Sequence, residues 1–216
     1  MKAFHRQNML QQRSLMDIID KIAIYGKSGH GKVLADIARA RGFKEILWID
    51  DDPKKEALRF LDFYEFYHDV PVLLGVGDNH TRKKLFHSLK SKGFSLPSIA
   101  HPSAIISESA EISEGSVIMP NAVINADVKI AQGVIVNTGA IIEHDCIIED
   151  FVHISPKVAL AGGVRVAKFS HIGIGVNVIQ GVMIGENAIV GAGASVIRDL
   201  PSDVTAVGVP AKVIKS

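Results

Sequence analysis

The stretch 136–160, VNTGAIIEHDCIIEDFVHISPKVAL, decides the fold of this chain. Every sixth residue in it is a large aliphatic one, and this six-residue period runs without a slip from Ile106 to Val196. Two positions before each of these residues stands a small or β-branched one. Side chains at positions i−2 and i lie on one face of a short strand. Such hexapeptide repeats predict a parallel β-helix, in which three hexads close a triangular coil of about 18 residues.

Burial of the aliphatic residues of this six-residue period also supplies the free energy that a stack of coils needs. Burying one Val, Leu or Ile side chain is worth about 1.5–3 kcal/mol, so the inward residues can hold many short strands together. An ordinary β-sandwich is the alternative, but sandwiches do not keep a fixed period with no insertion. Each coil of a β-helix contacts only its neighbours, so we expect the ends of the stack to be covered.

Composition narrows the class of protein. The chain has 216 residues, of which 47% are hydrophobic, and a formal net charge of +1, which is typical of a globular protein. No basic surplus indicates a nucleic-acid partner, and no apolar run of about 18 residues indicates a membrane span. The N-terminus lacks the apolar stretch of a signal peptide, so we expect a cytoplasmic protein. The single cysteine, Cys146, falls on a small inward position, where a thiol is inert.

The residues before the repeats alternate between strand and helix patterns. KIAIYG at 21–26, KEILWID at 44–50 and VPVLLGVG at 70–77 read as strands, with helical spacing of apolar residues after the first and the third. That order predicts a small parallel sheet of Rossmann type, which binds ligands at the carboxyl ends of its strands. We expect four segments: an N-terminal tail at 1–20, a Rossmann-like domain at 21–98, the β-helix at 99–200 and a C-terminal segment at 201–216.

A glycine-rich turn, GKSGHGK at 26–32, follows the first strand. Its spacing is that of a P-loop, but the next residue is Val33, where a P-loop needs Ser or Thr to hold Mg²⁺. The dinucleotide fingerprint does not fit either, because its first two glycines should be two positions apart. What remains is a turn that opens a helix, whose free N–H groups suit a diphosphate. Asp50 could accept hydrogen bonds from a ribose or a base. A tight turn beside a solvated acidic loop stays the alternative.

The β-helix carries its unusual residues at corners and outward positions. His144 should lie at a coil corner beside Asp145, with Gly162 at the same corner one coil further on. The pair faces a bare glycine backbone, which leaves room for a substrate and offers N–H groups that suit an oxyanion. A surface His–Asp pair with no catalytic role is the alternative interpretation. His153 and His171 point outward and should stack about 4.8 Å apart. Zinc is one interpretation of these histidines, as in β-helical carbonic anhydrases. None of them has the five-residue spacing used there, so we expect no metal.

Together these pieces resemble a known family. The segments KIAIYGKSGHGKV, LWIDDD, LLGVGDN, HPSA, NTGAIIEHDCIIEDFVHIS and GVPAK occur in one order over residues 21–216. They are similar to the hexapeptide-repeat acetyltransferases of bacterial nucleotide-sugar pathways, above all to the N-acetyltransferases that make UDP-N,N′-diacetylbacillosamine. The sialic acid O-acetyltransferase-like proteins are related to them. The resemblance implies a left-handed β-helix that forms a homotrimer. It also implies a UDP-amino-sugar held by the N-terminal domain and acetyl-CoA held between adjacent β-helices.

The resemblance also implies roles for individual residues. His144 would be the general base, and Asp145 would orient its ring and raise its basicity. The compared bacillosamine enzyme carries Glu in place of this Asp. The residues that would contact acetyl-CoA are His153, Gly162, Ile174 and Ala192. The residues that would hold the nucleotide-sugar are Ser28, Gly29, His30, Asp50, Asp51 and Gly77.

The implied reaction is direct acetyl transfer from acetyl-CoA to the 4-amino group of a UDP-4-amino-4,6-dideoxy-N-acetylhexosamine. The product would be UDP-N,N′-diacetylbacillosamine or a close relative. A base with a pKa near neutrality suits this step and accelerates it by roughly 10²–10⁴-fold. Two alternatives remain. One is O-acetylation of a sialic acid or related sugar on the same fold, and the other is a non-catalytic nucleotide-sugar-binding or scaffold protein.

Overall fold

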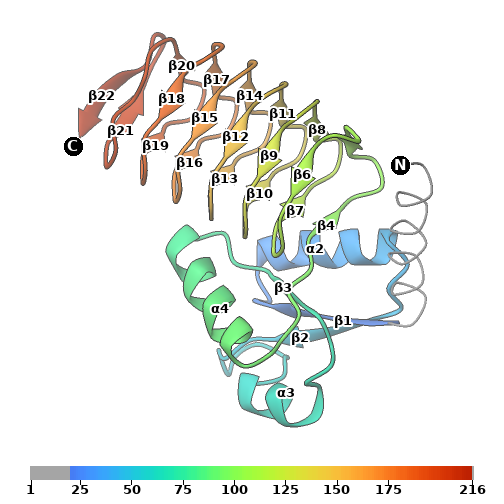
Figure 1. Cartoon of the computed structure of the whole chain (residues 1–216). Helices are drawn as coiled ribbons and strands as arrows, with labels where there is room; N and C mark the ends of the chain where they lie inside the picture. The colour runs from blue at the N-terminus through green and yellow to red at the C-terminus, as the bar shows by residue number, and fades with distance from the viewer. Residues whose placement is uncertain (1–19, 216) are drawn as a thin grey trace.

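The computed structural model describes residues 20–215 and shows an N-terminal α/β domain followed by a long β-helix (Figure 1). The predicted tail at 1–20 lies outside the described residues except for Asp20. The N-terminal domain has a parallel sheet with strand order β2-β1-β3. Its elements are β1 (Lys21–Tyr25), α2 (Gly29–Ala40), β2 (Glu45–Ile49), α3 (Phe60–Phe66), β3 (Val72–Leu74) and α4 (Asn79–Ser91). The predicted sheet of Rossmann type is confirmed, although β3 is shorter than the expected strand. No described helix is long and apolar enough to cross a membrane.

Two tight turns set the start of the helices that border the sheet. Ser28 is the N-cap of α2, and its side-chain oxygen accepts a hydrogen bond from the N–H of Gly31 at 3.4 Å. A Cβ on Gly31 would lie 2.0 Å from the carbonyl oxygen of Gly26, so only glycine allows α2 to begin this close to the sheet. Asp78 caps α4 by accepting from the N–H of Thr81 at 2.8 Å. Both helices therefore begin just beyond the carboxyl ends of β1 and β3.

The β-helix has three flat sides, each a sheet of very short strands joined in parallel from coil to coil. We name them the docking sheet, the second sheet and the third sheet. The docking sheet consists of β4 (Ile99–Ala100), β7 (Val117–Ile118), β10 (Ile135–Val136), β13 (His153–Ile154), β16 (His171–Ile172), β19 (Ile189–Val190), β21 (Thr205–Val207) and the antiparallel β22 (Lys212–Lys215). The second sheet consists of β5 (Ile105–Ile106), β8 (Val123–Ile124), β11 (Ile141–Ile142), β14 (Ala159–Leu160), β17 (Asn177–Val178) and β20 (Ser195–Val196). The third sheet consists of β6 (Glu111–Ile112), β9 (Lys129–Ile130), β12 (Ile147–Ile148), β15 (Arg165–Val166) and β18 (Met183–Ile184).

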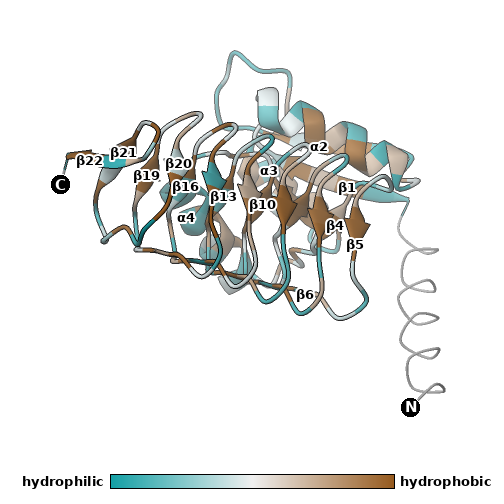
Figure 2. Cartoon of the chain, turned by 90° about the horizontal axis from the view of Figure 1, so that it is seen from above, coloured by the Kyte–Doolittle hydropathy of each residue, from teal (hydrophilic) through white to brown (hydrophobic). Residues whose placement is uncertain are grey.

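The pairing register confirms the predicted coil. Ile135 pairs with His153, which pairs with His171, so each residue lies beside the one a full coil away. The inward residues form one continuous core, in which both Ile142 and Cys146 are 0% exposed. The inward residues of the first coil, such as Ile106, are only partly buried, since fewer coils surround them. Figure 2 shows hydrophobic strands such as β4 and β5 at one end of the β-helix and the hydrophilic β13 further along it.

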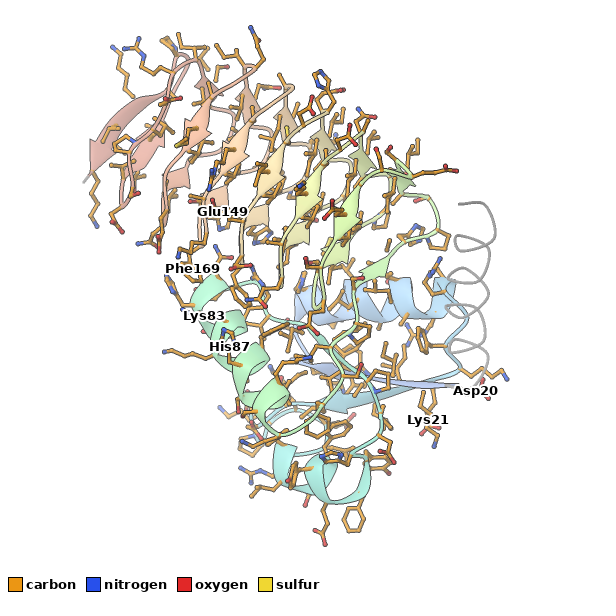
Figure 3. The ribbon with its side chains drawn as sticks, in the orientation of Figure 1. Asp20, Lys21, Lys83, His87, Glu149 and Phe169 are labelled. Carbon is orange, nitrogen blue, oxygen red and sulfur yellow. The ribbon has the colours of Figure 1, made fainter. Side chains whose placement is uncertain are left out.

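The N-terminal domain covers one side of the β-helix. Val117 and Ile135 point outward from the docking sheet into a core that they share with α2. Helix α4 packs where the third sheet meets the docking sheet, and the ring of Phe86 lies 5.5 Å from that of Phe151. Figure 3 shows Phe169, from the same edge, beside α4. The edge between the second and third sheets is the one opposite this domain.

Candidate active site

His144 lies at the predicted corner, between β11 and β12, on the edge that joins the second and third sheets. We call this the His144 edge; it comprises residues 143–146 and 161–164. The Nδ1 atom of His144 lies 2.8 Å from Oδ2 of Asp145, and this hydrogen bond is the largest cause that raises the pKa of His144 above its ordinary value. Asp145 has a left-handed backbone (φ 61), which turns the chain at the corner. Because Nδ1 donates to Asp145, Nε2 is left to take a proton from a substrate.

Bare backbone faces the ring of His144. A Cβ on Gly162 would lie 2.6 Å from both Cε1 and Nε2 of this ring, so any larger residue would displace the imidazole. The N–H of the next residue, Gly163, donates to the carbonyl oxygen of His144 at 2.9 Å. That N–H is therefore already used within the β-helix.

Cys146 is close to the pair in sequence but separate from it in space. Its side chain points into the core of the β-helix, and its thiol donates to the carbonyl oxygen of Ala161 at 3.2 Å. Burial raises the pKa of the thiol to about 11. A buried thiol that stays protonated cannot attack a thioester, so the geometry favours direct transfer over a covalent cysteine intermediate.

A cavity of about 450 Å³ opens at the carboxyl ends of the N-terminal sheet. Four of the six residues predicted to hold the nucleotide-sugar line it, namely Ser28, Asp50, Asp51 and Gly77. The other two, Gly29 and His30, follow in the first turn of α2 and do not line it. Burial lowers the pKa of His30 to about 4, so its ring is neutral. The sequence thus located the cavity, while two of its predicted residues lie just outside it.

Two carboxylates and a lysine shape the polar wall of this cavity. Asp50 accepts hydrogen bonds from the backbone N–H of Lys27 at 2.8 Å and from Nζ of Lys55 at 2.7 Å. Burial alone would raise the pKa of Asp50, but the hydrogen bonds, led by that of Lys55, hold it below its ordinary value. The hydroxyl of Tyr25 donates to Asp51. Lys55, which was not predicted, therefore adds a positive charge to a cavity whose wall includes Asp50 and Asp51.

His153 and His171 stack on neighbouring strands of the docking sheet, as their phase predicts. Their ring centroids lie 4.6 Å apart, and their Nε2 atoms lie 3.3 Å from Nδ2 of Asn137 and 3.0 Å from Oγ of Ser155, respectively. Burial is the main cause that lowers the pKa of His153 to about 3, so its ring is neutral. Among residues 20–215, no group of three or more His, Cys, Asp or Glu is placed to hold a metal ion.

The four residues predicted to contact acetyl-CoA do not meet within one chain. Gly162 lies on the His144 edge. Ile174 and Ala192 lie on successive coils of a different edge, where the docking sheet passes into the second sheet, and both are exposed. His153 points from the docking sheet toward the N-terminal domain. A single chain therefore presents separate parts of the predicted acetyl-CoA site.

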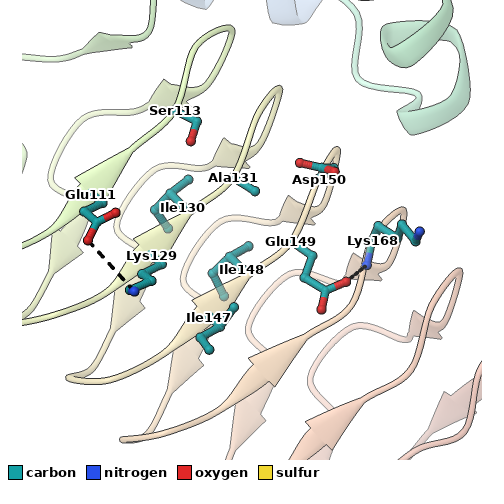
Figure 4. A pocket seen from close by; sticks show the side chains of 10 residues that line it. All are labelled: Glu111, Ser113, Lys129, Ile130, Ala131, Ile147, Ile148, Glu149, Asp150 and Lys168. Carbon is teal, nitrogen blue, oxygen red and sulfur yellow. Dashed lines mark hydrogen bonds and ion pairs between the residues drawn. The ribbon is translucent and has the colours of Figure 1, made fainter.

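A second cavity, of about 300 Å³, lies on the third sheet (Figure 4). Glu111 and Lys129 approach each other to 4.0 Å in its wall, and Glu149 accepts from the backbone N–H of Lys168 at 3.3 Å. None of the predicted site residues lines this cavity. Its lining therefore mixes two such polar contacts with the apolar side chains of Ile130, Ile147 and Ile148.

The fold and the corner pair together define an acyltransferase of the hexapeptide-repeat class, and known proteins agree. Residues 21–89 match the PglD N-terminal domain family. The UDP-N-acetylbacillosamine N-acetyltransferase of Bacillus subtilis (strain 168) is 41% identical over 107 residues, 44% of this chain and 50% of that protein. A histidine-to-asparagine mutant of perosamine N-acetyltransferase from Caulobacter crescentus, solved with CoA and GDP-perosamine, is 39% identical. The match covers 91% of this chain and 97% of that one, with a TM-score of 0.87.

A third relative is the acetyltransferase domain of PglB from Neisseria gonorrhoeae, solved with acetyl coenzyme A. It is 36% identical, with a TM-score of 0.86, and the match covers 91% of this chain and all of that domain. The chain belongs to the family of hexapeptide-repeat nucleotide-sugar N-acetyltransferases that these proteins represent. It spans about half the length of the Bacillus relative. The resemblance in the sequence is thereby confirmed at the level of the family.

Proposed function

We propose that this chain transfers the acetyl group of acetyl-CoA to the 4-amino group of a nucleotide-linked amino sugar, with His144 as the general base. The observation that carries the proposal is the His144–Asp145 pair held against the bare backbone of Gly162. An exposed ring with one free nitrogen can meet an amine, and the glycine leaves space for the thioester beside it. The Caulobacter relative, which binds CoA and GDP-perosamine, supports this substrate class.

The proposed proton transfers use the residues of this edge. The neutral amine attacks the thioester carbonyl carbon, so that an N–C bond forms while Nε2 of His144 takes a proton from the nitrogen. The C–S bond then breaks, and the CoA thiolate leaves with the proton that His144 returns. Asp145 stabilises the transient imidazolium by accepting from Nδ1. A base positioned in this way accelerates such a step by roughly 10²–10⁴-fold.

We propose that the working site lies between copies in a homotrimer. The N-terminal domain covers the docking sheet, whereas the His144 edge lies on the opposite side of the same β-helix. Ile141 and Ile147, on the strands that flank this edge, are 40% and 38% exposed and offer apolar surface to a neighbouring copy. A neighbour could bring its Ile174 and Ala192 across from the other edge. A groove between copies would then unite the separated parts of the acetyl-CoA site.

We propose a UDP-linked acceptor, UDP-4-amino-4,6-dideoxy-N-acetylhexosamine, with UDP-N,N′-diacetylbacillosamine or a close relative as the product. The name of the Bacillus relative supports the uracil nucleotide. The Caulobacter relative binds a guanine nucleotide, so the GDP-linked amino sugar is the competitor to include. The cavity lined by Ser28, Asp50 and Gly77 is the proposed nucleotide-sugar site. A higher kcat/KM for the GDP-linked sugar than for the UDP-linked sugar would overturn this choice of nucleotide.

Acetyl transfer by the wild type, His144→Ala and Cys146→Ala tests the reaction. We expect His144→Ala to keep its fold and lose about 10²–10⁴-fold in kcat. Cys146→Ala should keep nearly full activity, because its thiol is buried in the core. Mass spectrometry of the product distinguishes N-acetylation from O-acetylation, with a sialic acid offered as the alternative acceptor. An inactive cysteine mutant beside an active histidine mutant would overturn direct transfer. Nucleotide-sugar binding without turnover by the wild type would favour a non-catalytic binding protein.

A further inference from the structure

Arg82, in the first turn of α4, is the largest fully buried side chain of the described residues and is 1% exposed. Every nitrogen of its guanidinium donates to an oxygen of the protein. Nε donates to Gly133 O (2.7 Å), Nη1 to Gly77 O (2.8 Å) and Val76 O (3.3 Å), and Nη2 to Asn79 Oδ1 (2.8 Å), Phe151 O (2.9 Å) and Val152 O (3.4 Å). A planar guanidinium can hold so many acceptors at fixed angles, which a lysine cannot.

The acceptors of Arg82 belong to two different parts of the molecule. Val76 and Gly77 form the wall of the nucleotide cavity just beyond β3. Gly133 and Phe151 are corner residues of successive β-helix coils, on the edge against which α4 packs. The guanidinium therefore bridges the nucleotide cavity and the β-helix through direct hydrogen bonds.

Asn79 extends this bridge by one more coil. Its Oδ1 accepts from Arg82, while its Nδ2 donates to the carbonyl oxygens of Phe169 at 2.8 Å and Ser170 at 3.3 Å. The two side chains thus hold the same corner of three consecutive coils, at Gly133, Phe151 and Phe169. Figure 3 shows Phe169 beside Lys83 of α4. The cavity wall is fixed to a stretch of β-helix and not to a single residue.

The charge of Arg82 is also unusual for a merely structural contact. No carboxylate of residues 20–215 forms an ion pair with it, and Asp78 acts on it only at longer range. A buried cation held by neutral carbonyls is costly, and a neutral apolar residue often stabilises a fold equally well. Burial is the largest cause that lowers the pKa values of His30, His153 and His171, and the positive charge of Arg82 lowers them further. A position that serves packing alone would not require this charge.

We propose that Arg82 is a positioning residue, which fixes the Val76–Gly77 wall of the nucleotide cavity relative to the β-helix and so sets the affinity for the nucleotide-sugar. Arg82 does not line the cavity and acts through the two carbonyl oxygens that it holds. The inference rests on the proposed function only in its choice of ligand. Loss of the guanidinium should loosen the wall while the apolar contacts of α4 keep the domain docked.

Arg82→Lys tests this inference, with Phe86→Ala as the matched control. Phe86 lies on the same helix as Arg82 and packs against Phe151, which Arg82 also contacts, but Phe86 does not line the cavity. For Arg82→Lys we expect the KM of the nucleotide-sugar to rise by about 10–100-fold, the scale of lost hydrogen bonds to a charged group. The KM of acetyl-CoA should stay within about twofold. Phe86→Ala should lower the melting temperature and leave both constants near those of the wild type.

Hydrogen exchange gives a second readout that does not depend on turnover. Amides of residues 75–78 should exchange faster in Arg82→Lys and remain protected in Phe86→Ala. If Arg82→Lys does not fold, Asn79→Ala replaces it, since this change removes the oxygen that holds Nη2 and leaves the guanidinium in place. Asn79→Ala should then show the same two effects at smaller size. Unchanged nucleotide-sugar KM and unchanged exchange, or an equal rise of KM in Phe86→Ala, would overturn the inference.

Failure of this inference and failure of the proposed function give different experimental results. If the wild type acetylates no nucleotide-linked amino sugar, the proposed function fails. Calorimetric binding of UDP and of GDP, together with exchange at residues 75–78, then still tests Arg82. Weaker binding and faster exchange in Arg82→Lys would support the inference, and equal values would overturn it.

Discussion

Replacing Gly162 by alanine should damage catalysis without damaging the fold. The new Cβ would lie 2.6 Å from Cε1 and Nε2 of His144, whereas ordinary contacts are 3.4–4 Å. The imidazole must therefore move by roughly 1 Å, and a misplacement of that size can cost about 10²-fold in rate. The ring is free to move, because 63% of the His144 side chain is exposed.

The stability of the folded protein should not fall in Gly162→Ala. The backbone of Gly162 is outside the left-handed region, so alanine fits it without strain. Replacing glycine at such a position stabilises a protein by about 0.4–1 kcal/mol, because the unfolded chain loses freedom. We therefore expect Gly162→Ala to melt at or above the temperature of the wild type while its kcat falls by about 10²-fold.

Gly181→Ala is the matched control. Gly181 lies on the next coil, has a φ of +70° and has open space where a Cβ would be. Alanine there is strained by about 1–2 kcal/mol, so this variant should melt earlier and keep its activity. The kcat of acetyl transfer at saturating acetyl-CoA and the melting temperature are measured for the wild type, Gly162→Ala and Gly181→Ala. Activity within about threefold of wild type in a folded Gly162→Ala protein would refute the placement of the base against this glycine.

Three further predictions follow from other parts of the structure. Asp145→Asn should move the acid limb of kcat/KM to lower pH, because Asp145 raises the pKa of His144 and the base works unprotonated; a shift to higher pH would contradict this. Ile142→Asp should give insoluble or unfolded protein, since it places an unpaired charge in a core that is 0% exposed; a soluble variant with a native melt would show that the register is wrong. Asp50→Ala should raise the KM of the nucleotide-sugar and spare that of acetyl-CoA in initial-rate measurements, because Asp50 holds Lys27 and Lys55 at the proposed nucleotide-sugar cavity; an equal rise in both would place the sugar elsewhere.

Periodic and local features of the molecule could be predicted from the sequence alone. A fixed hexad places residues one coil apart side by side, so the inward position of Cys146 and the contact of His144 with Gly162 follow from counting. The N-terminal sheet was predictable for a related reason, because the alternation of each strand is encoded within a few residues. These features depend on backbone pairing, which a regular register fixes in advance.

Contacts between the two domains depend on how they dock, and no local pattern encodes them. Arg82, Lys83 and Lys84 are consecutive basic residues of one helix. Arg82 is buried against coils that lie 51 and 69 positions away, Lys83 lies 4.7 Å from the centroid of the Phe169 ring, and Lys84 is exposed. Helical spacing alone could not identify the buried one, because burial is set by the surface that the helix meets. For the same reason, only the tertiary structure showed that the cavity at the carboxyl ends of the N-terminal sheet and His144 lie on different sides of one chain.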